Sequence, residues 1–347
     1  MNQSFVSIAT TIYPPSLQLK TLATLTSKSG GKTIVVGDQK TPSSWHETNI
    51  TFFSLQAQLA EYPFTDFAKM LPINHYCRKN LGYLYGMREN PEWIYETDDD
   101  NLVSTEVLNP PSLSSKEADQ YINNQGWLNI YNYTNILSRP ELVGTVWPRG
   151  YPLELINDKF QKSDSKEKVD YIEIQAPIAN GLVDGDPDVD AIFRLTRSLP
   201  LQFEKLKRDL IICGGTWAPF NSQNTWWHKS VFPLLYLPVT TSFRVTDILR
   251  SYVAQSIIMK FDMGIRFFGP SAIQERNEHS LIGDFEQEIP LYLNSQKMMS
   301  EINSSIQTSD NITQAQFMAY ERLEKLGFVE SNELNLLNCW IESIAKC

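Results

Sequence analysis

Three adjacent aspartates are the residues of this sequence with the clearest chemical potential. Asp98, Asp99 and Asp100 end the stretch WIYETDDDN, residues 93–101, whose apolar start predicts a buried strand. Hard divalent cations prefer oxygen ligands and keep positions open for substrate phosphates. The pattern therefore predicts a site for Mg²⁺ or Mn²⁺ and a nucleotide diphosphate. A solvated acidic turn is the alternative, because Asp is common in loops.

A second acidic group lies in GLVDGDPDVDAIFRLTR, residues 181–197, where aspartates recur at alternate positions. Alternate residues of an extended segment share one face, so several of these carboxylates can point together. We select Asp188 as a candidate general base and Asp186 and Asp190 as candidate ligands of a sugar or acceptor. A turn rich in Gly, Pro and Asp is the alternative.

A third group lies in TTSFRVTDILRSYVAQ, residues 240–255. Asp247 suits a helix N-terminus, and it can act as a general base if burial or its neighbours tune its pKa. A simple N-cap is the alternative. Arg244 and Arg250 offer fixed, paired donors that suit phosphate or sugar hydroxyl groups, so we assign both to nucleotide-sugar binding.

Two weaker signals complete the candidates. Asn224 and Trp226 lie in APFNSQNTWWHKSVFPLLYLP, residues 218–238, which we expect to form a polar, aromatic loop before an apolar strand. Such side chains suit stacking on sugars, although tryptophans are also ordinary core residues. His279 lies among acids in residues 273–288, which makes it a candidate third metal ligand, with an ordinary surface histidine as the alternative.

Alternating strand-like and helix-like segments must position these residues. We expect strands at 5–12, 32–38, 50–55, 93–97, 127–134 and 171–181, and helices at 16–28, 73–89, 245–260, 311–326 and 332–345. Alternation of this kind predicts an α/β protein with a mostly parallel sheet, whose ligands bind at the carboxyl ends of the strands. The triple aspartate falls at such an end.

Composition narrows the possible partners and the compartment. The formal net charge of −10 disfavours general binding to nucleic acid or to anionic membranes. The four cysteines are widely spaced and form no metal-binding pattern, which indicates reduced thiols. The first residues do not read as a signal peptide, and no apolar run reaches the ~18 residues of a membrane span. We therefore expect a cytoplasmic protein without a membrane span.

The motifs together resemble the STELLO family of glycosyltransferase-like proteins. The stretches that carry the resemblance are CRKNLGYLYGMRENPEWIYETDDDN, GTVWPRGYPLE, VDGDPDVDAIFRLTR, APFNSQNTWW and LPVTTSFRVTDILRSYVAQ, which lie within roughly residues 75–280. The resemblance implies a GT-A-type, Rossmann-like fold. We expect this domain to span residues 1–285 and a helical C-terminal extension to span residues 286–347.

The resemblance also implies an activity, namely metal-dependent transfer of a sugar from a nucleotide-diphosphate donor to a hydroxyl acceptor. A UDP-sugar is the expected donor, a glycan the expected acceptor, and Mn²⁺ or Mg²⁺ the expected cofactor. By this analogy Asp98 and Asp100 hold the metal, Asp98 and Asp99 contact the donor, and Asp38 lies near the nucleobase. Arg78 then reaches the base or the diphosphate, and Asp247, followed by Asp188, is the candidate base of an inverting reaction.

Two other functions remain open at this point. A nucleotide-sugar mutase of the UDP-arabinopyranose type would isomerise a free UDP-sugar and would need no acceptor. A non-catalytic scaffold of glycan synthesis would keep the fold but lose its acids, whereas the acids at 98–100 and 186–190 are all present. Their presence favours an enzyme. A nucleotidyltransferase is less favoured, because SIATTIYPPS lacks a Gly-rich, Arg-containing loop.

Overall fold

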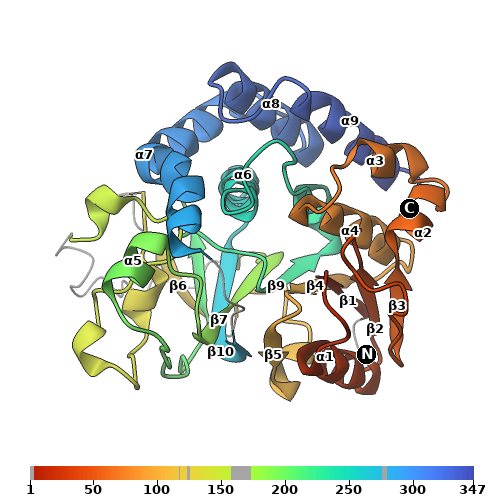
Figure 1. Ribbon diagram of the computed structural model, residues 1–347. Helices are drawn as coiled ribbons and strands as arrows, with labels where there is room; N and C mark the ends of the chain where they lie inside the picture. Colours follow the sequence, from red (N-terminus) through yellow and green to blue (C-terminus); the bar gives the residue numbers. More distant parts are fainter. Residues whose placement is uncertain (1–3, 117, 123–125, 158–172, 276–279) are drawn as a thin grey trace.

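A single mixed sheet forms the centre of the computed structural model, which describes residues 4–116, 118–122, 126–157, 173–275 and 280–347 (Figure 1). The strand order is β3-β2-β1-β4-β9-β7-β10-β8-β6, and β5 pairs with β10 outside this path. The strands are β1 Phe5–Thr10, β2 Lys32–Val36, β3 Ile50–Phe53, β4 Trp93–Thr97, β5 Asn101–Val103, β6 Asp119–Ile122, β7 Ile178–Gly185, β8 Leu210–Cys213, β9 Asn224–His228 and β10 Ile265–Gln274. The α/β class is confirmed.

The first half of the sheet is parallel and matches the expected alternation of strands and helices. β1 pairs in parallel with both β2 and β4, so their carboxyl ends meet at one edge of the sheet. Helix α1, Leu17–Lys28, begins at Ser16, whose side chain accepts a hydrogen bond from the Leu19 amide. Helix α4, Lys79–Met87, contacts β1 and β2 closely, since a Cβ at Gly82 would lie 2.8 Å from Ile8.

The second half of the sheet departs from a parallel arrangement. β9 is antiparallel to both β4 and β7, and it lies inside residues 218–238, where we expected a loop before an apolar strand. That prediction is wrong in both parts, because the apolar residues form the 3-10 helix η7, Lys229–Leu235. Pro233 lacks an N–H group for a strand ladder, which disfavours the expected strand.

Two other strand predictions need correction. The strand expected at 127–134 is instead largely the 3-10 helix η3, Ile130–Tyr133, capped by the Asn129 side chain. The strand expected at 171–181 begins only at Ile178, as β7, and residues 171 and 172 lie outside the described part of the chain. In both segments the aromatic or β-branched composition favoured a strand, but local capping or tertiary packing decided the backbone.

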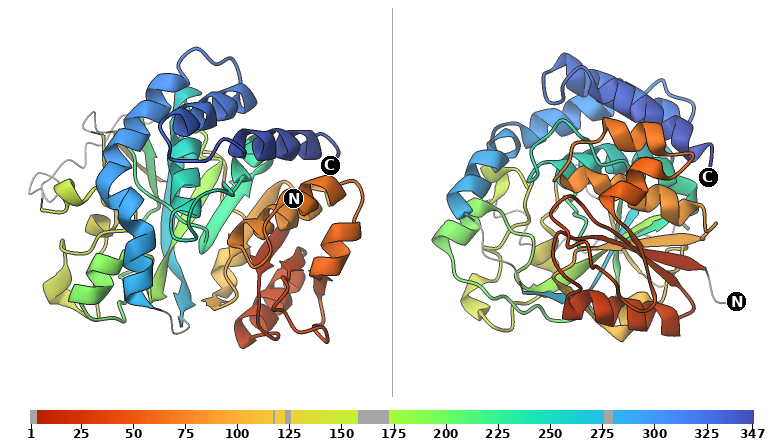
Figure 2. Two further views of the ribbon diagram at one scale, coloured as in Figure 1. Left: turned by 45° about the horizontal axis from the view of Figure 1, so that its top comes forward. Right: turned by 45° about the vertical axis from the view of Figure 1, so that its right-hand side comes forward.

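Helices cover both faces of the sheet. α6, Thr246–Lys260, is buried almost throughout, and three helices arch over it: α7 Leu281–Ser305, α8 Ile312–Lys325 and α9 Glu333–Ile344 (Figures 1 and 2). The shorter α-helices are α2 Leu55–Ala60, α3 Thr65–Met70 and α5 Ala191–Thr196. A further 3-10 helix, η1 Tyr76–Arg78, precedes α4. The helical C-terminal region is confirmed, and the division at residue 285 stays a prediction.

The described helices do not include a candidate membrane span. None of them is both long enough and apolar enough to cross a bilayer.

Candidate functional site

A cavity of about 440 Å³ opens at the carboxyl ends of β1, β2 and β4. The side of the cavity near these strands is lined by the loop after β1, the segment from the end of β2 to Asp38, the residues around Tyr76, and the three aspartates after β4. The predicted site residues that line it are Asp38, Arg78, Asp98, Asp99, Asp100, Asp188, Arg244 and Asp247. The structure thus brings acids from three separate motifs to one place.

The three aspartates follow β4 directly, and each has its own neighbours. Asp98 Oδ1 accepts hydrogen bonds from Tyr76 Oη at 2.9 Å and from Lys79 Nζ at 3.3 Å. Asp99 Oδ2 accepts a short bond from the Thr11 hydroxyl. Gln274 Nε2 lies 3.1 Å from each carboxylate oxygen of Asp100. Most of these partners are neutral hydroxyl or amide groups.

Burial disfavours the charged forms of Asp98 and Asp99. Burial raises the pKa of Asp98, and the ammonium of Lys79 opposes this only in part. Burial likewise raises the pKa of Asp99 to about 6, although the hydrogen bond from Thr11 lowers it in part. Burial and the nearby acids raise the pKa of Tyr76 well above its usual value, so its hydroxyl keeps its proton. An added cation would relieve the burial cost of both carboxylates.

A second carboxylate group lies around Arg149. The guanidinium donates to both oxygens of Asp188, at 2.8 and 2.9 Å, and to both oxygens of Asp247, at 2.9 and 3.0 Å. A further N–H bonds the backbone carbonyl of Arg244. Each of these three side chains is at least nine-tenths buried, yet all three line the cavity. Paired two-point bonds of this kind fix both geometry and charge.

The Arg149 cluster, defined here as Asp188, Arg149 and Asp247, differs electrically from the triple aspartate. Burial alone would raise the pKa of Asp247, but the charge and hydrogen bonds of Arg149 outweigh it and lower the pKa below its usual value. A carboxylate with a lowered pKa is a weak proton acceptor near neutral pH. The cluster is thus better suited to accepting hydrogen bonds than to removing a proton.

Asp38 and Arg78 line another part of the cavity. Asp38 Oδ1 accepts from the Gln39 amide at 2.7 Å, and Oδ2 accepts from the His75 amide at 3.1 Å. Arg78 is 1% exposed and donates from Nε to Gln58 Oε1 at 2.8 Å. Its Nη2 has no hydrogen-bond partner among the described residues. Burial lowers the pKa of Arg78, and Asp38 raises it in opposition. A buried donor without a described partner, in the wall of a cavity, is available to a ligand or to water.

Other predicted site residues lie outside the cavity wall. Arg250 is buried in an ion pair with Glu96, at 2.6 Å, and Trp226 lies in the core with its Nε1 bonded to Val107. The remaining placements are Asn224 bonded to Tyr95 and Ser271, Asp186 paired with Arg194, and Asp190 capping α5. His279 lies outside the described residues.

Several lining residues were not selected from the sequence. Arg149 lies in GTVWPRGYPLE, a stretch that carried the family resemblance, so that motif was its only signal. Ser222 lies in APFNSQNTWW, another such stretch, whereas Tyr76 and Gln274 contribute polar side chains outside the quoted motifs. Tyr13 and Phe243 are 47% and 53% exposed at the cavity, which leaves ring surface available for a ligand.

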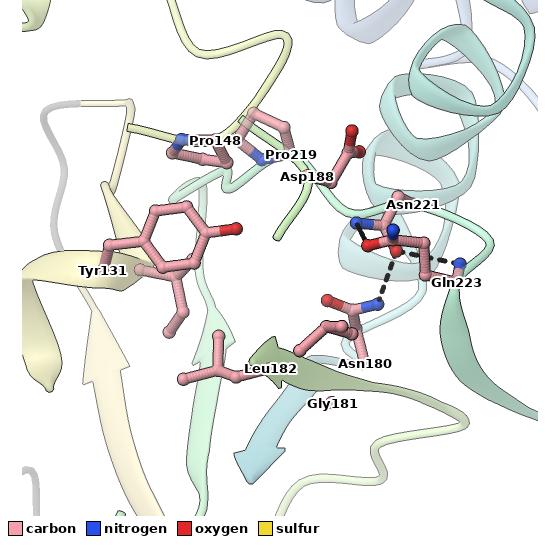
Figure 3. A pocket seen from close by; sticks show the side chains of 11 residues that line it. Tyr131, Pro148, Asn180, Gly181, Leu182, Asp188, Pro219, Asn221 and Gln223 are labelled. Atoms are coloured by element: carbon pink, nitrogen blue, oxygen red, sulfur yellow. Dashed lines mark hydrogen bonds between the residues drawn. The ribbon is translucent and has the colours of Figure 1, made fainter. Parts of the chain in front are cut away.

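A smaller polar pocket adjoins the cavity and shares Asp188 and Gln223 with it. Its volume is about 10 Å³, which is room for about one water molecule. Figure 3 shows the Tyr131 hydroxyl pointing into it, opposite the linked amides of Asn180, Asn221 and Gln223. The space is too small for a sugar ring, so the large cavity is the candidate substrate site.

The donor atoms of the cavity fit a hard cation that is completed by substrate. Among the described residues, no group of three or more His, Cys, Asp or Glu side chains is arranged to hold a metal ion alone. Mg²⁺ and Mn²⁺ sites for nucleotides commonly use one or two carboxylates together with phosphate oxygens and water. Asp98 and Asp100 supply such carboxylates beside the cavity, and burial raises the pKa of Asp98, so an added cation would favour its ionised form.

Comparison with known proteins agrees with this architecture. A family model described as STELLO glycosyltransferases matches residues 244–346, which include Arg244, Asp247 and the helices α6 to α9. An Arabidopsis thaliana protein named "Probable glycosyltransferase STELLO1" is 28% identical over 364 aligned residues, which cover 99% of this chain. The chain is thus similar to STELLO glycosyltransferases over nearly its whole length. A second Arabidopsis protein, "Probable glycosyltransferase STELLO2", is 27% identical and aligns with 81% of this chain.

The chain spans less than half the length of these plant relatives. It aligns with 44% of the length of STELLO1 and with 36% of STELLO2. The family resemblance expected from the motifs is confirmed. The alignment with STELLO1 includes nearly the whole chain, and so extends well beyond the residues that the family model matches.

Proposed function

We propose that this protein transfers a sugar from a nucleotide-diphosphate donor to a hydroxyl acceptor, supported by a divalent cation. The observation that carries the proposal is the convergence of the triple aspartate, Asp38 and the Arg149 cluster on one cavity at strand carboxyl ends. Ligands of α/β proteins bind at such ends. The donor would then lie between Asp38 and the Arg149 cluster, with its diphosphate near the aspartates.

The charges of the cavity support a cation beside the diphosphate. Aspartates outnumber arginines in the wall, and two of the arginines already have carboxylate partners: Arg149 in its cluster, and Arg244 with Glu288 at 2.6 Å. A diphosphate would therefore meet excess negative charge. Mn²⁺ or Mg²⁺, held by Asp98 and Asp100, would neutralise charge on the departing diphosphate. Tyr76 and Lys79 fix the orientation of Asp98.

Arg78 and Asp38 support a nucleobase with a neighbouring N–H and C=O. The unpartnered Nη2 of Arg78 can donate to a carbonyl, and the Asp38 carboxylate can accept from an N–H. Uracil presents an imide N–H between two carbonyl groups, which suits this pair and agrees with a UDP-sugar as donor. Adenine lacks a ring carbonyl and would leave Arg78 without its acceptor.

The Arg149 cluster supports a role in holding sugar hydroxyl groups. Asp247 and Asp188 are the carboxylates first proposed as the base of an inverting reaction. Because Arg149 keeps Asp247 ionised at a lowered pKa, that carboxylate accepts a hydrogen bond readily but accepts a proton poorly. We therefore assign Asp247 to orientation of the donor sugar or the acceptor.

Thermal-shift measurements with UDP, GDP and ADP, and with UDP-sugars, test the proposal with and without Mn²⁺. A ligand of the native state raises the melting temperature as its concentration exceeds Kd. We expect a Mn²⁺-dependent shift with uridine nucleotides that is lost in the Asp98→Ala, Asp100→Ala double variant. Asp310→Ala, an exposed residue far along the chain, is the control. An equal shift in the double variant, or no shift with any nucleotide, would refute the assignment.

A further inference from the structure

Two hydroxyl groups join the triple aspartate to the Arg149 cluster. Tyr76 Oη lies 2.9 Å from Asp98 Oδ1 and also forms a short hydrogen bond with Ser222 Oγ. Ser222 Oγ in turn lies 3.3 Å from Asp247 Oδ2. All four residues line the cavity. They form a continuous hydrogen-bond chain between the two acidic groups, which we call the hydroxyl chain.

The hydroxyl chain has three contacts to fill but only two protons. Tyr76 and Ser222 have one hydroxyl proton each, and either can donate in their mutual bond. In the first arrangement, Tyr76 donates to Asp98 and Ser222 donates to Tyr76. In the second, Tyr76 donates to Ser222 and Ser222 donates to Asp247. Whenever the bond between Tyr76 and Ser222 is made, one of the two carboxylates therefore lacks a proton from this chain.

Neighbouring groups permit both arrangements. Lys79 Nζ lies 2.9 Å from Tyr76 Oη and 3.3 Å from Asp98 Oδ1, so the phenol oxygen and Asp98 both keep a donor in either state. Asp247 similarly keeps the two bonds from Arg149. The two arrangements differ only by rotation of two O–H bonds, because no heavy atom has to move.

We propose that Tyr76 and Ser222 are positioning residues that couple occupancy of the triple aspartate to Asp247. The inference rests on the proposed function, because the charge that arrives at the aspartates is that of the proposed cation. A positive charge at Asp98 repels the Tyr76 proton and competes for the same oxygen. It therefore favours the second arrangement, in which Ser222 donates to Asp247. By linkage, Asp247 then favours cation binding to the same extent.

Binding of Mn²⁺ in the presence of saturating UDP, measured from the electron paramagnetic resonance signal of free Mn²⁺ against a protein-free UDP blank, tests the coupling without a donor sugar. Ser222→Ala leaves Asp98 as the acidic acceptor of the Tyr76 proton, so we expect Kd for Mn²⁺ to rise about three- to tenfold, the range of one net hydrogen bond. Tyr76→Phe removes the competing proton, so we expect Kd to fall by a similar factor. A merely structural role would raise Kd in both variants.

A second comparison separates the hydroxyl chain from direct repulsion between charges. Asp247 also acts on Asp98 through space, since its charge raises the pKa of Asp98. Asp247→Asn should therefore weaken Mn²⁺ binding in every background. We expect Asp247→Asn to raise the Kd for Mn²⁺ by a factor at least about threefold larger in the wild-type background than in Ser222→Ala, because Ser222→Ala interrupts the hydroxyl chain.

The matched controls remove similar hydroxyl groups outside the chain. Ser251→Ala removes a buried serine hydroxyl that bonds Ile248 within α6, and Tyr13→Phe removes a phenol hydroxyl from the same cavity. Neither should change the effect of Asp247→Asn on Kd. Thermal unfolding of each variant confirms that it is folded.

The outcomes distinguish this inference from the proposed function. If Mn²⁺ binds the wild type but Tyr76→Phe weakens binding, the coupling is refuted and the proposed cation site is retained. The same conclusion follows if Asp247→Asn changes Kd equally in the wild-type and Ser222→Ala backgrounds. Absence of Mn²⁺ binding to the wild type in the presence of UDP would refute both. If Ser222→Ala does not fold, the direction of the Tyr76→Phe effect decides the inference by itself.

Discussion

The triple aspartate and the Arg149 cluster contain the same acidic residue in opposite electrostatic surroundings. At the triple aspartate, burial raises the pKa of Asp98 and Asp99, and their partners include neutral hydroxyl groups. At the Arg149 cluster, one guanidinium bonds both carboxylates by two contacts each, and the pKa of Asp247 falls. At Asp98 burial outweighs the ammonium contact from Lys79 at 3.3 Å, whereas at Asp247 the guanidinium of Arg149 outweighs burial.

This difference assigns different tasks to groups that look alike in the sequence. A cavity that must hold a diphosphate gains most from a cation where its carboxylates are least compensated. A carboxylate already fixed by Arg149 has a constant charge and orientation, which suits recognition of hydroxyl groups. The same contrast separates two arginines: Arg149 is fully engaged, whereas Nη2 of Arg78 has no partner among the described residues.

The largest expected effect follows from removal of the internal counter-ion. Arg149→Met leaves Asp188 and Asp247 buried as two unpaired carboxylates. We expect the free energy of unfolding at pH 7.5 to fall by about 3–5 kcal/mol, the usual cost of breaking a buried ion pair from one side. Urea unfolding followed by tryptophan fluorescence measures it.

Two further variants show whether the effect arises from uncompensated charge. Adding Asp188→Asn and Asp247→Asn to Arg149→Met should recover part of the lost stability, since no buried charge then remains in the cluster. Arg322→Met breaks a partly exposed pair with Glu301 and should cost about 1 kcal/mol or less. A cost for Arg149→Met as small as that for Arg322→Met would mean that the cluster is not electrostatically coupled.

A smaller effect, on binding rather than folding, is expected at Arg78. Arg78→Met should weaken uridine nucleotide binding by about 1.5–3 kcal/mol, or roughly 10- to 100-fold, because a charged donor to the base is lost. The free energy of unfolding should change less in Arg78→Met than in Arg149→Met. Arg78→Met loses the hydrogen bond to Gln58, but it also removes a buried charge that has no ion pair, and the two effects oppose each other. Isothermal titration calorimetry and urea unfolding measure the two effects.

Arg250 is the matched control for Arg78. It is equally buried, but it is paired with Glu96 and lies outside the cavity wall. Arg250→Met should therefore lower stability and leave the nucleotide Kd of the folded protein unchanged. The opposite pattern, with Arg250 affecting binding and Arg78 affecting only stability, would reverse the assignment of the two arginines.

Local sequence patterns predicted the parts of the fold that local physics determines. Strands β1, β2, β3 and β4 and helices α1, α6, α8 and α9 have clear periodicity, caps or turns, and all were expected. β9 was missed because NTWWH has no alternation of polar and apolar residues. Its buried polar side chains are satisfied by distant groups, such as Asn224 by Tyr95 and Thr225 by Asn180. Such pairings cannot be inferred from spacing along one chain.

The site shows the same limit. The sequence pointed to Asp98, Asp188 and Asp247 as separate motifs, and the structure places them around one cavity. It could not show that Arg149 joins two of them, because its partners lie 39 and 98 residues away. Nor could it show that Arg250, only one turn beyond Asp247, faces Glu96 in the core. A residue type predicts what a side chain can bind, but packing decides which partner it meets.

The smallest expected effect is a pH dependence that distinguishes the two acidic groups. The pKa of Asp99 is about 6 in the folded protein, above its usual value. Between about pH 4 and pH 6 the native state therefore binds more protons than the unfolded state, and stability falls as pH rises. Asp99→Asn removes this loss. With metal chelated, we expect its free energy of unfolding relative to wild type to rise by on the order of 1–2 kcal/mol from pH 4.5 to 7.5, allowing for partial exposure.

Asp247→Asn supplies the contrast, because the pKa of Asp247 lies below its usual value and the carboxylate stays ionised across the same range. Any stability that its charge contributes is present throughout and is lost only at lower pH. Its difference from wild type should therefore be the same at pH 4.5 and pH 7.5. Urea unfolding at both pH values measures both variants. Parallel behaviour of the two would mean that Asp99 and Asp247 share one electrostatic environment, which would remove the physical basis for placing the cation at the triple aspartate.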